Sequence, residues 1–197
     1  MAGRRPTARG LTALLACAPL ALSACGGGDD QSVNEATGTY EVDIVRASFA
    51  ERQNVAQQEE FTIAVRNTGD EALPNLSVTV DSFSERSEAS GLADASRPVW
   101  IVDEAPSGGS TAYVNTWALG RLPAGSAREF TWKVTAVAPG EHRVRYRVNA
   151  GLDGNAKAVL AGGVAPEGTF DVRIATAPPI SRVDPESGDI VREGEGG

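Results

Sequence analysis

Side chains that bind transition metals are nearly absent from this sequence of 197 residues. It has one histidine, His142, one methionine, Met1, and two cysteines, Cys17 and Cys25. A copper or zinc site built by a single chain needs several such ligands. We therefore predict no metal centre of this kind and no cofactor.

The same scarcity argues against catalysis. A Ser-His-Asp site could use only His142, which follows a Pro-Gly turn, and the sequence has no Gly-x-Ser-x-Gly motif. Neighbouring acids such as Asp103-Glu104 are typical of a solvated surface. Gly162-Gly163 lacks the lysine and the strand-to-helix context of a phosphate loop. We predict that the protein is not an enzyme.

A long hydrophobic run is also missing. Residues 11–24 carry no charge, but a membrane-spanning helix needs about 20 apolar residues. Three arginines precede this run, and small residues end it, which is typical of an export signal. The pair Arg4-Arg5 leaves twin-arginine export open beside an ordinary basic leader.

One cysteine follows that run directly. The stretch Leu22-Ser23-Ala24-Cys25 resembles the bacterial lipobox. The resemblance implies a signal peptide over residues 1–24 and a diacylglycerol on the Cys25 thiol. The partner would then be the membrane, and the protein would lie lipid-anchored on the outer face of the cytoplasmic membrane. A plain secretory leader with a free Cys25, or a Cys17–Cys25 disulfide, is the alternative.

Basic residues are the minority, with 18 Lys and Arg against 26 Asp and Glu and a net charge of −8. Removal of residues 1–24 takes away three arginines and no acid, so the charge becomes −11. Such a chain is not expected to bind nucleic acid. Calcium needs only oxygen ligands and stays an open question. The candidate ligands, none at the spacing of a known calcium loop, are Asp81, Glu85, Glu88, Asp94, Asp153 and Asn155.

The ends of the mature chain have little to bury. Residues 25–37 are rich in glycine and acids and predict a flexible tether. Residues 177–197 combine prolines, charges and scattered aliphatic residues, and they predict a disordered tail. The folded domain is expected over residues 38–176.

This domain shows the periodicity of strands, and no window sustains an amphipathic helix. Large apolar residues alternate with smaller or polar ones in six segments, 40–44, 61–66, 76–81, 129–134, 143–148 and 170–174. Asp153-Gly154 predicts a hairpin turn between 144–150 and 156–160. The pattern predicts an all-β protein, an antiparallel β-sandwich of about 7–9 strands.

Two segments carry a family resemblance. FTIAVRNTGDEALPNLSVTVDSF, from Phe61, and TWALGRLPAGSAREFTWKVTAVAPGEHRVRYRVNAG, from Thr116, are similar to the bacterial Ig-like domains of the CARDB and DUF11 type. The shared features are a strand ending in Asn-Thr-Gly and a Leu-Gly-x-Leu-x-x-Gly loop. The resemblance covers about residues 40–175 and implies an Ig-like fold, with adhesive, spacer or carrier-attached roles at cell surfaces. Its motifs are structural and do not identify a ligand.

Two surfaces are candidates for binding a partner. Arg143, Arg145 and Arg147 alternate on one strand and could bind a carboxylate or sulfate. The alternative is cross-strand pairing with Glu129, Asp171, Glu41 or Asp43.

The second candidate is the stretch 84–110, longer than the usual connection at this point of the family pattern. It carries Arg97, Trp100 and Asp103 among Gly, Ser and Pro, and aromatic and arginine side chains are enriched in binding hot spots. Trp100 could instead cap the edge of the sandwich, and the stretch could be a disordered spacer. We expect Trp117 and Trp132, at regular strand positions, in the core.

Together these features predict a non-enzymatic interaction or structural module of the cell envelope. Its partner would be a protein or a cell-wall glycan. The alternative is a lipoprotein that binds a solute or glycan with the 84–110 stretch or the arginine face.

Overall fold

A computed structural model describes residues 35–88, 96–177, 181–183, 185 and 190–192. The predicted signal peptide, Cys25 and most of the predicted tether lie outside these residues. No helix in the described part of the chain is long and apolar enough to cross a membrane.

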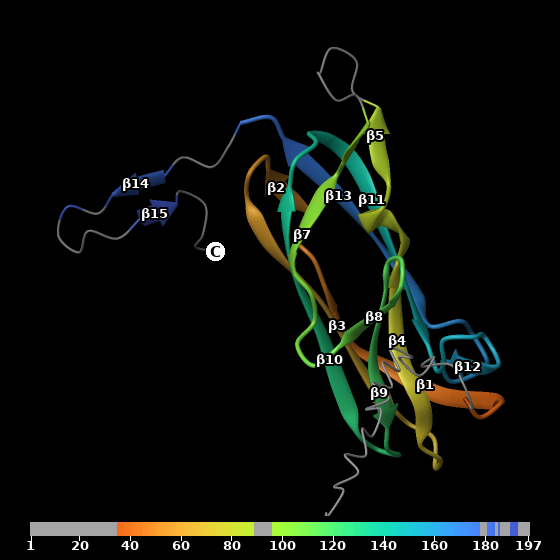
Figure 1. Cartoon of the computed structure of the whole chain (residues 1–197). Coiled ribbons are helices and arrows are strands. Elements are labelled where there is room, and N and C mark those ends of the chain that lie inside the picture. The colour runs from red at the N-terminus through yellow and green to blue at the C-terminus, as the bar shows by residue number, and fades with distance from the viewer. Residues whose placement is uncertain (1–34, 89–95, 178–180, 184, 186–189, 193–197) are drawn as a thin grey trace, which may run out of the picture.

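The described residues form an all-β sandwich of two sheets, which confirms the predicted fold class (Figure 1). The five-stranded sheet has the order β12 (Ala156–Val159), β1 (Gly38–Ser48), β3 (Gln58–Asn67), β10 (Ala127–Ala136) and β7 (Trp100–Glu104). The six-stranded sheet has the order β2 (Arg52–Asn54), β13 (Glu167–Ala175), β11 (Gly140–Asn149), β4 (Leu73–Val80), β9 (Thr116–Leu122) and β8 (Ser110–Tyr113).

Two details differ from the prediction. The described part of the two sheets holds eleven strands rather than about 7–9, because short strands such as β2 extend the edges. The sheets are also mixed: β12 pairs with β1 and β2 pairs with β13 in parallel, while the other pairings are antiparallel.

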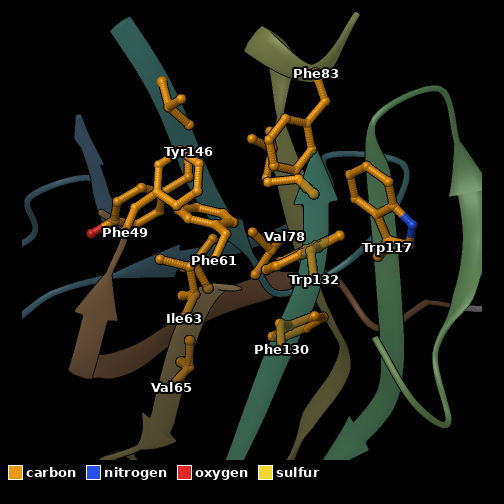
Figure 2. Packing of buried hydrophobic residues seen from close by; sticks show 14 of the residues in the cluster. Phe49, Phe61, Ile63, Val65, Val78, Phe83, Trp117, Phe130, Trp132 and Tyr146 are labelled. Atoms are coloured by element: carbon orange, nitrogen blue, oxygen red, sulfur yellow. The ribbon is translucent and has the colours of Figure 1, made fainter. Parts of the chain in front are cut away.

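The core lies between the sheets, where the apolar side of each alternating strand is buried. Trp132 on β10 is among the largest side chains that are fully buried there (Figure 2). The rings of Phe61, Trp117 and Phe130 lie 5.1, 5.4 and 5.7 Å from it, centroid to centroid. The prediction that Trp117 and Trp132 are core residues is confirmed. Burial of aromatic rings of this size contributes much of the stability of a small sandwich.

The Asn-Thr-Gly motif has a structural role at the end of β3. Asn67 is fully buried, and its Nδ2 donates to the carbonyls of Glu71 (2.8 Å) and Leu122 (3.1 Å). Its Oδ1 accepts from the Gly69 amide at 3.1 Å. One side chain thus satisfies two carbonyls and one amide and fixes the turn between the two sheets.

The predicted hairpin at Asp153-Gly154 is wrong. The chain turns there, but β12 leaves the sheet of β11 and pairs in parallel with β1, with Tyr40 opposite Ala158. Tyr40 and Ala158 are both buried, so the alternation seen in the sequence serves the opposite sheet.

The stretch 84–110 is not a free connection. It contains β5 (Arg86–Glu88), β6 (Ser96–Pro98) and β7, and β7 is the edge strand of the five-stranded sheet beside β10. Residues 89–95 lie outside the described part. The predicted loop is therefore corrected to a short antiparallel pair followed by a sheet strand.

In the predicted tail, β14 (Ser181–Val183) and β15 (Ile190–Arg192) pair with each other. The other residues beyond 177, apart from 185, lie outside the described part. Disorder of the tail as a whole stays a prediction.

Candidate functional site

Four neighbouring strands of the six-stranded sheet place one row of side chains on its outer face. Arg147 on β11 lies opposite Thr79 on β4, Thr79 lies opposite Thr116 on β9, and Thr116 lies opposite Tyr113 on β8. Strands lie about 4.8 Å apart, so the row is about 14 Å long. Alternation puts the neighbours of these residues, such as Val148 and Trp117, into the core.

Hydrogen bonds order the middle of this row. The hydroxyls of Thr79 and Thr116 lie 2.9 Å apart, and Asn149 Nδ2 donates to Thr79 Oγ1 at 3.3 Å. Ser77 lies beside Asn149 in register, and its hydroxyl donates to the Gly151 carbonyl at 3.3 Å. The floor is therefore a polar surface whose side chains have fixed positions.

The segment after β11 forms a wall over this floor and makes a groove of about 470 Å³. Lys157 of β12 and Pro166 line the wall, while Tyr113 and Arg147 line other parts of the groove. This volume is within the range of small-ligand sites, about 300–1,000 Å³. We call this feature the outer-sheet groove.

Glu35 and Gly151 hold the wall in place. One Glu35 oxygen accepts from the Leu152 amide at 2.6 Å, and the other accepts from Asn75 Nδ2 at 3.2 Å. A Cβ on Gly151 would collide with the Glu35 carboxylate and lie 2.9 Å from the Ala156 Cβ, so glycine permits this close approach.

The turn beside Tyr113 is also fixed. Asn115 has a positive φ of 60°, which asparagine tolerates better than most residues. Its carbonyl accepts from the Val80 amide at 2.8 Å. Tyr113 is 50% exposed and Val114 is 81% exposed, so a rigid turn presents an aromatic ring at the end of the row.

The charge of the outer-sheet groove differs from that of the protein. Its lining includes Arg147 and Lys157, and none of its lining residues in the described chain is Asp or Glu. Asp153 lies in the adjoining loop, where hydrogen bonds from the Asn155 amide and side chain hold its pKa below the usual range. An acidic protein thus carries a cationic groove.

The arginine face exists as predicted, but its members are paired. Arg143 Nε donates to Asp171 at 2.7 Å, and this partner raises the pKa of Arg143. Arg145 pairs with Glu85 at 2.8 Å. The cross-strand alternative is therefore confirmed for Arg143 with Asp171. Glu85, the partner of Arg145, follows the short 3-10 turn Asp81–Phe83 and is not among the four expected acids.

Arg147 also has an acidic neighbour, Asp81, at 3.5 Å. Both side chains are about half exposed, and such exposed pairs contribute little stability. Arg147 is the one predicted site residue that lines the outer-sheet groove.

Trp100 is not an exposed contact residue, so the interpretation as a partner-binding aromatic is wrong. It is 2% exposed, and its Nε1 donates to Gln53 Oε1 at 2.8 Å. The alternative, an aromatic packed at the sandwich edge, describes it correctly. Its ring also lies 5.6 Å from that of His142, whose Nε2 is hydrogen-bonded to the Ala138 carbonyl at 3.1 Å.

The three candidates of the 84–110 stretch are not brought together in one site. Arg97 is half-buried on β6. Asp103 is exposed on β7 and accepts from Thr135 at 2.6 Å and from Gln58 at 3.1 Å. Trp100 lies between them in sequence but points into the core.

Sequence reasoning missed most of the outer-sheet groove. Thr79, Thr116 and Tyr113 are ordinary outward residues in their strands, and only the register of four strands aligns them. One signal was available. The sequence has only two lysines, Lys133 and Lys157, so each of them stands out. In the structure Lys133 pairs with Glu104 at 2.9 Å, whereas Lys157 has no ion pair within the described residues.

No group of three or more His, Cys, Asp or Glu side chains suited to a metal occurs among the residues that the structure describes. Of the candidate calcium ligands, Asp81 and Glu85 face arginines. Cys25 lies outside the described part, so its lipidation stays a prediction.

The chain matches no protein-family model. No curated protein matches it either. Solved structures similar to it include the CARDB domain of a Pyrococcus furiosus protein in complex with di-metal ions. That domain has 16% identity and a TM-score of 0.42, over 71% of this chain and 93% of that one.

A cohesin module from a Clostridium perfringens family 33 glycoside hydrolase has 10% identity and a TM-score of 0.41, over 72% of this chain and 100% of that one. A Listeria innocua β-glucosidase in complex with glucose has 15% identity and a TM-score of 0.37, over 71% of this chain and 16% of that one. None of these similarities carries a function over to this chain.

Proposed function

We propose that this protein is a non-enzymatic binding module of the cell envelope, anchored by a lipid on Cys25, that holds a solute or glycan in the outer-sheet groove. One observation carries the binding role. The row from Arg147 to Tyr113 forms the floor of a groove large enough for a small ligand, and it combines one aromatic ring, hydroxyl groups and a cation. Ligand sites commonly combine a few placed polar groups with aromatic surface.

The surroundings of His142 support a non-enzymatic role. Its ring packs against Trp100, and its Nε2 is hydrogen-bonded to a backbone carbonyl. A general base must reach the proton that it removes. The single histidine of the chain instead supports the edge of the sandwich.

The groove favours ligand binding over a purely structural role. The alternative surfaces are used within the fold, because Trp100 is buried and Arg143 and Arg145 hold acids. The lipid anchor rests on Leu22-Ser23-Ala24-Cys25 alone. It would place the groove outside the cytoplasmic membrane.

A thermal-shift screen tests the binding role. The full chain in detergent is heated with members of a panel of solutes and glycans, since a ligand above its Kd raises the midpoint of unfolding. We expect at least one compound to raise the Tm of the wild type and to lose this effect in an Arg147→Gln/Lys157→Gln variant. If no compound raises the Tm, or if the double variant responds equally, the groove is not the binding site.

A further inference from the structure

We infer that the ligand of the outer-sheet groove is a carboxylate-bearing saccharide, an inference that rests on the proposed function. The carboxylate would lie between Arg147 and Lys157, and the sugar rings would lie along Thr79 and Thr116 toward Tyr113. The assignment follows from the charge, the hydrogen-bonding groups and the aromatic end of the groove.

The charge selects an anion. Two cations line the groove of a chain with a net charge of −8, and no acid of the described residues does, so the groove is a local exception to the charge of the molecule. Lys157 has no ion pair within the described residues, and the pair of Arg147 with Asp81 is long at 3.5 Å. Lys157 is therefore available to a carboxylate, and Arg147 would exchange its long, half-exposed pair with Asp81 for charge-assisted hydrogen bonds to that carboxylate.

The floor favours a ligand with many hydroxyls. Asn149, Thr79 and Thr116 form a connected set of amide and hydroxyl groups in the lining of the groove, a chemistry that can both donate to and accept from the hydroxyls of a ligand. Tyr113, half exposed at the end of the row, offers an aromatic face beside a polar hydroxyl. The C–H face of a sugar ring suits such a surface.

An acidic peptide fits this floor less well. Extended peptides bind sheets mainly through backbone hydrogen bonds at a free edge. The groove lies on the face of β11, β4 and β9, whose backbones are already paired with one another. Recognition by this floor must come from side chains, which a saccharide with hydroxyls on every ring can use. The edge strand β12 lies in the wall and not in the floor.

Equilibrium binding to matched sugars tests the inference. The probes are oligosaccharides of glucuronic, galacturonic and mannuronic acid, each compared with its methyl ester, and the protein is the full chain in detergent. We expect at least one acid to bind. Its ester should have an affinity lower by about tenfold or more, because the ester lacks the charge. Binding of the acid should also weaken as salt is raised.

Three variants separate the groove from general charge. Lys157→Gln should lower the affinity for the acid by about five- to tenfold and leave the affinity for the ester unchanged. Lys133→Gln makes the same charge change on β10, away from the lining of the groove, and should have no effect. Tyr113→Ala should lower the affinity for acid and ester alike, and Tyr113→Phe should retain the wild-type affinity for both.

The outcomes also separate this inference from the proposed function. If an acid and its ester bind equally, or if neutral sugars or an acidic peptide such as oligoglutamate compete best, the inference is overturned while the groove remains a binding site. If no acid binds at millimolar concentration, the inference is overturned as well. If Lys157→Gln and Lys133→Gln weaken binding equally, the sugar binds by general charge, and both claims fail.

Discussion

At the scale of single residues, Trp100 links an edge strand to the core through one polar contact. Its indole nitrogen donates to Gln53, which is itself 2% exposed and donates to the Ala50 carbonyl at 3.0 Å. The ring also packs 5.8 Å from that of Phe49. A buried donor with a buried acceptor stabilises the fold because neither group can be left unpaired at low cost.

Substitution of Trp100 should therefore act on stability. We expect Trp100→Ala to lower the free energy of unfolding by about 3–5 kcal/mol, through lost packing. Trp100→Phe should cost about 1–3 kcal/mol, because Gln53 Oε1 loses its donor. Urea denaturation measures both changes. Ile101→Ala, at the exposed neighbour, is the control and should stay within about 0.5 kcal/mol of wild type; a similar small loss for Trp100→Ala would contradict the buried position.

Tyr146 makes the stability of the fold depend on pH in the alkaline range. It is 7% exposed, and burial raises its pKa. Its hydroxyl would ionise near pH 10 in the unfolded chain. Because the folded pKa lies above the unfolded one, the stability that Tyr146 contributes is complete below about pH 10 and is lost as pH rises through the folded pKa.

We therefore expect the wild type to lose more free energy of unfolding than Tyr146→Phe between about pH 9 and pH 11.5. Chemical denaturation at a series of pH values measures the difference between the two proteins. Parallel pH profiles would show that the Tyr146 hydroxyl is as accessible in the folded state as in the unfolded state.

At the scale of elements, the change of sheet between β11 and β12 creates the outer-sheet groove. If β12 had continued as a hairpin with β11, no wall would cover Ser77 and Thr79. Instead the chain crosses at Gly151 and is held there by Glu35, whose carboxylate accepts from the amides of Leu152 and Asp153. The absence of a side chain at Gly151 makes this crossing possible.

Gly151→Ala should therefore disturb the wall. Its Cβ would contact the Glu35 carboxylate and the Ala156 Cβ, and we expect a loss of about 1–3 kcal/mol in the free energy of unfolding. Adding Glu35→Ala should not restore full stability, since the contact with Ala156 remains. Gly69→Ala is the control, because its Cβ would meet only ordinary contacts at 3.5 Å and beyond. Equal effects at Gly151 and Gly69 would contradict the close crossing.

The strands could be predicted from the sequence and their partners could not. Alternation identifies which residues of β3, β4, β10 and β11 face the core, because a half-buried strand has a period of two. It does not say which strand lies beside which, so the predicted hairpin places β12 in the wrong sheet. The short strands β2 and β8 are too brief to show a pattern.

The candidate site was hidden for the same reason. Arg147 was found because three alternating arginines stand out in one strand. Its neighbours in the row come from three other strands, and Lys157 reaches the groove through a parallel pairing. Trp100 was misjudged because it lies in a segment rich in small residues, which resembles a loop until its pairing with β10 is known.

At the scale of the whole molecule, we propose a lipid anchor that holds the sandwich and its outer-sheet groove at the membrane. The Leu22-Ser23-Ala24-Cys25 sequence predicts that Cys25 is lipidated and becomes the first residue. In cells given a labelled fatty acid, we expect label on the wild type and an unprocessed, unlabelled precursor for Cys25→Ser. Cys17→Ser should be labelled normally. A water-soluble, unlabelled mature protein in wild-type cells would contradict the anchor.

The most direct test of the central claim, that the outer-sheet groove holds the ligand, is photo-crosslinking in intact cells. A photoreactive aromatic residue replaces Tyr113 in the groove or Ile101 on β7 of the other sheet, two positions of similar exposure at 50% and 47%. Mass spectrometry then identifies the adducts. We expect a saccharide adduct at position 113 that is absent at position 101. Equal adducts at both positions, or no adduct at position 113, would contradict it.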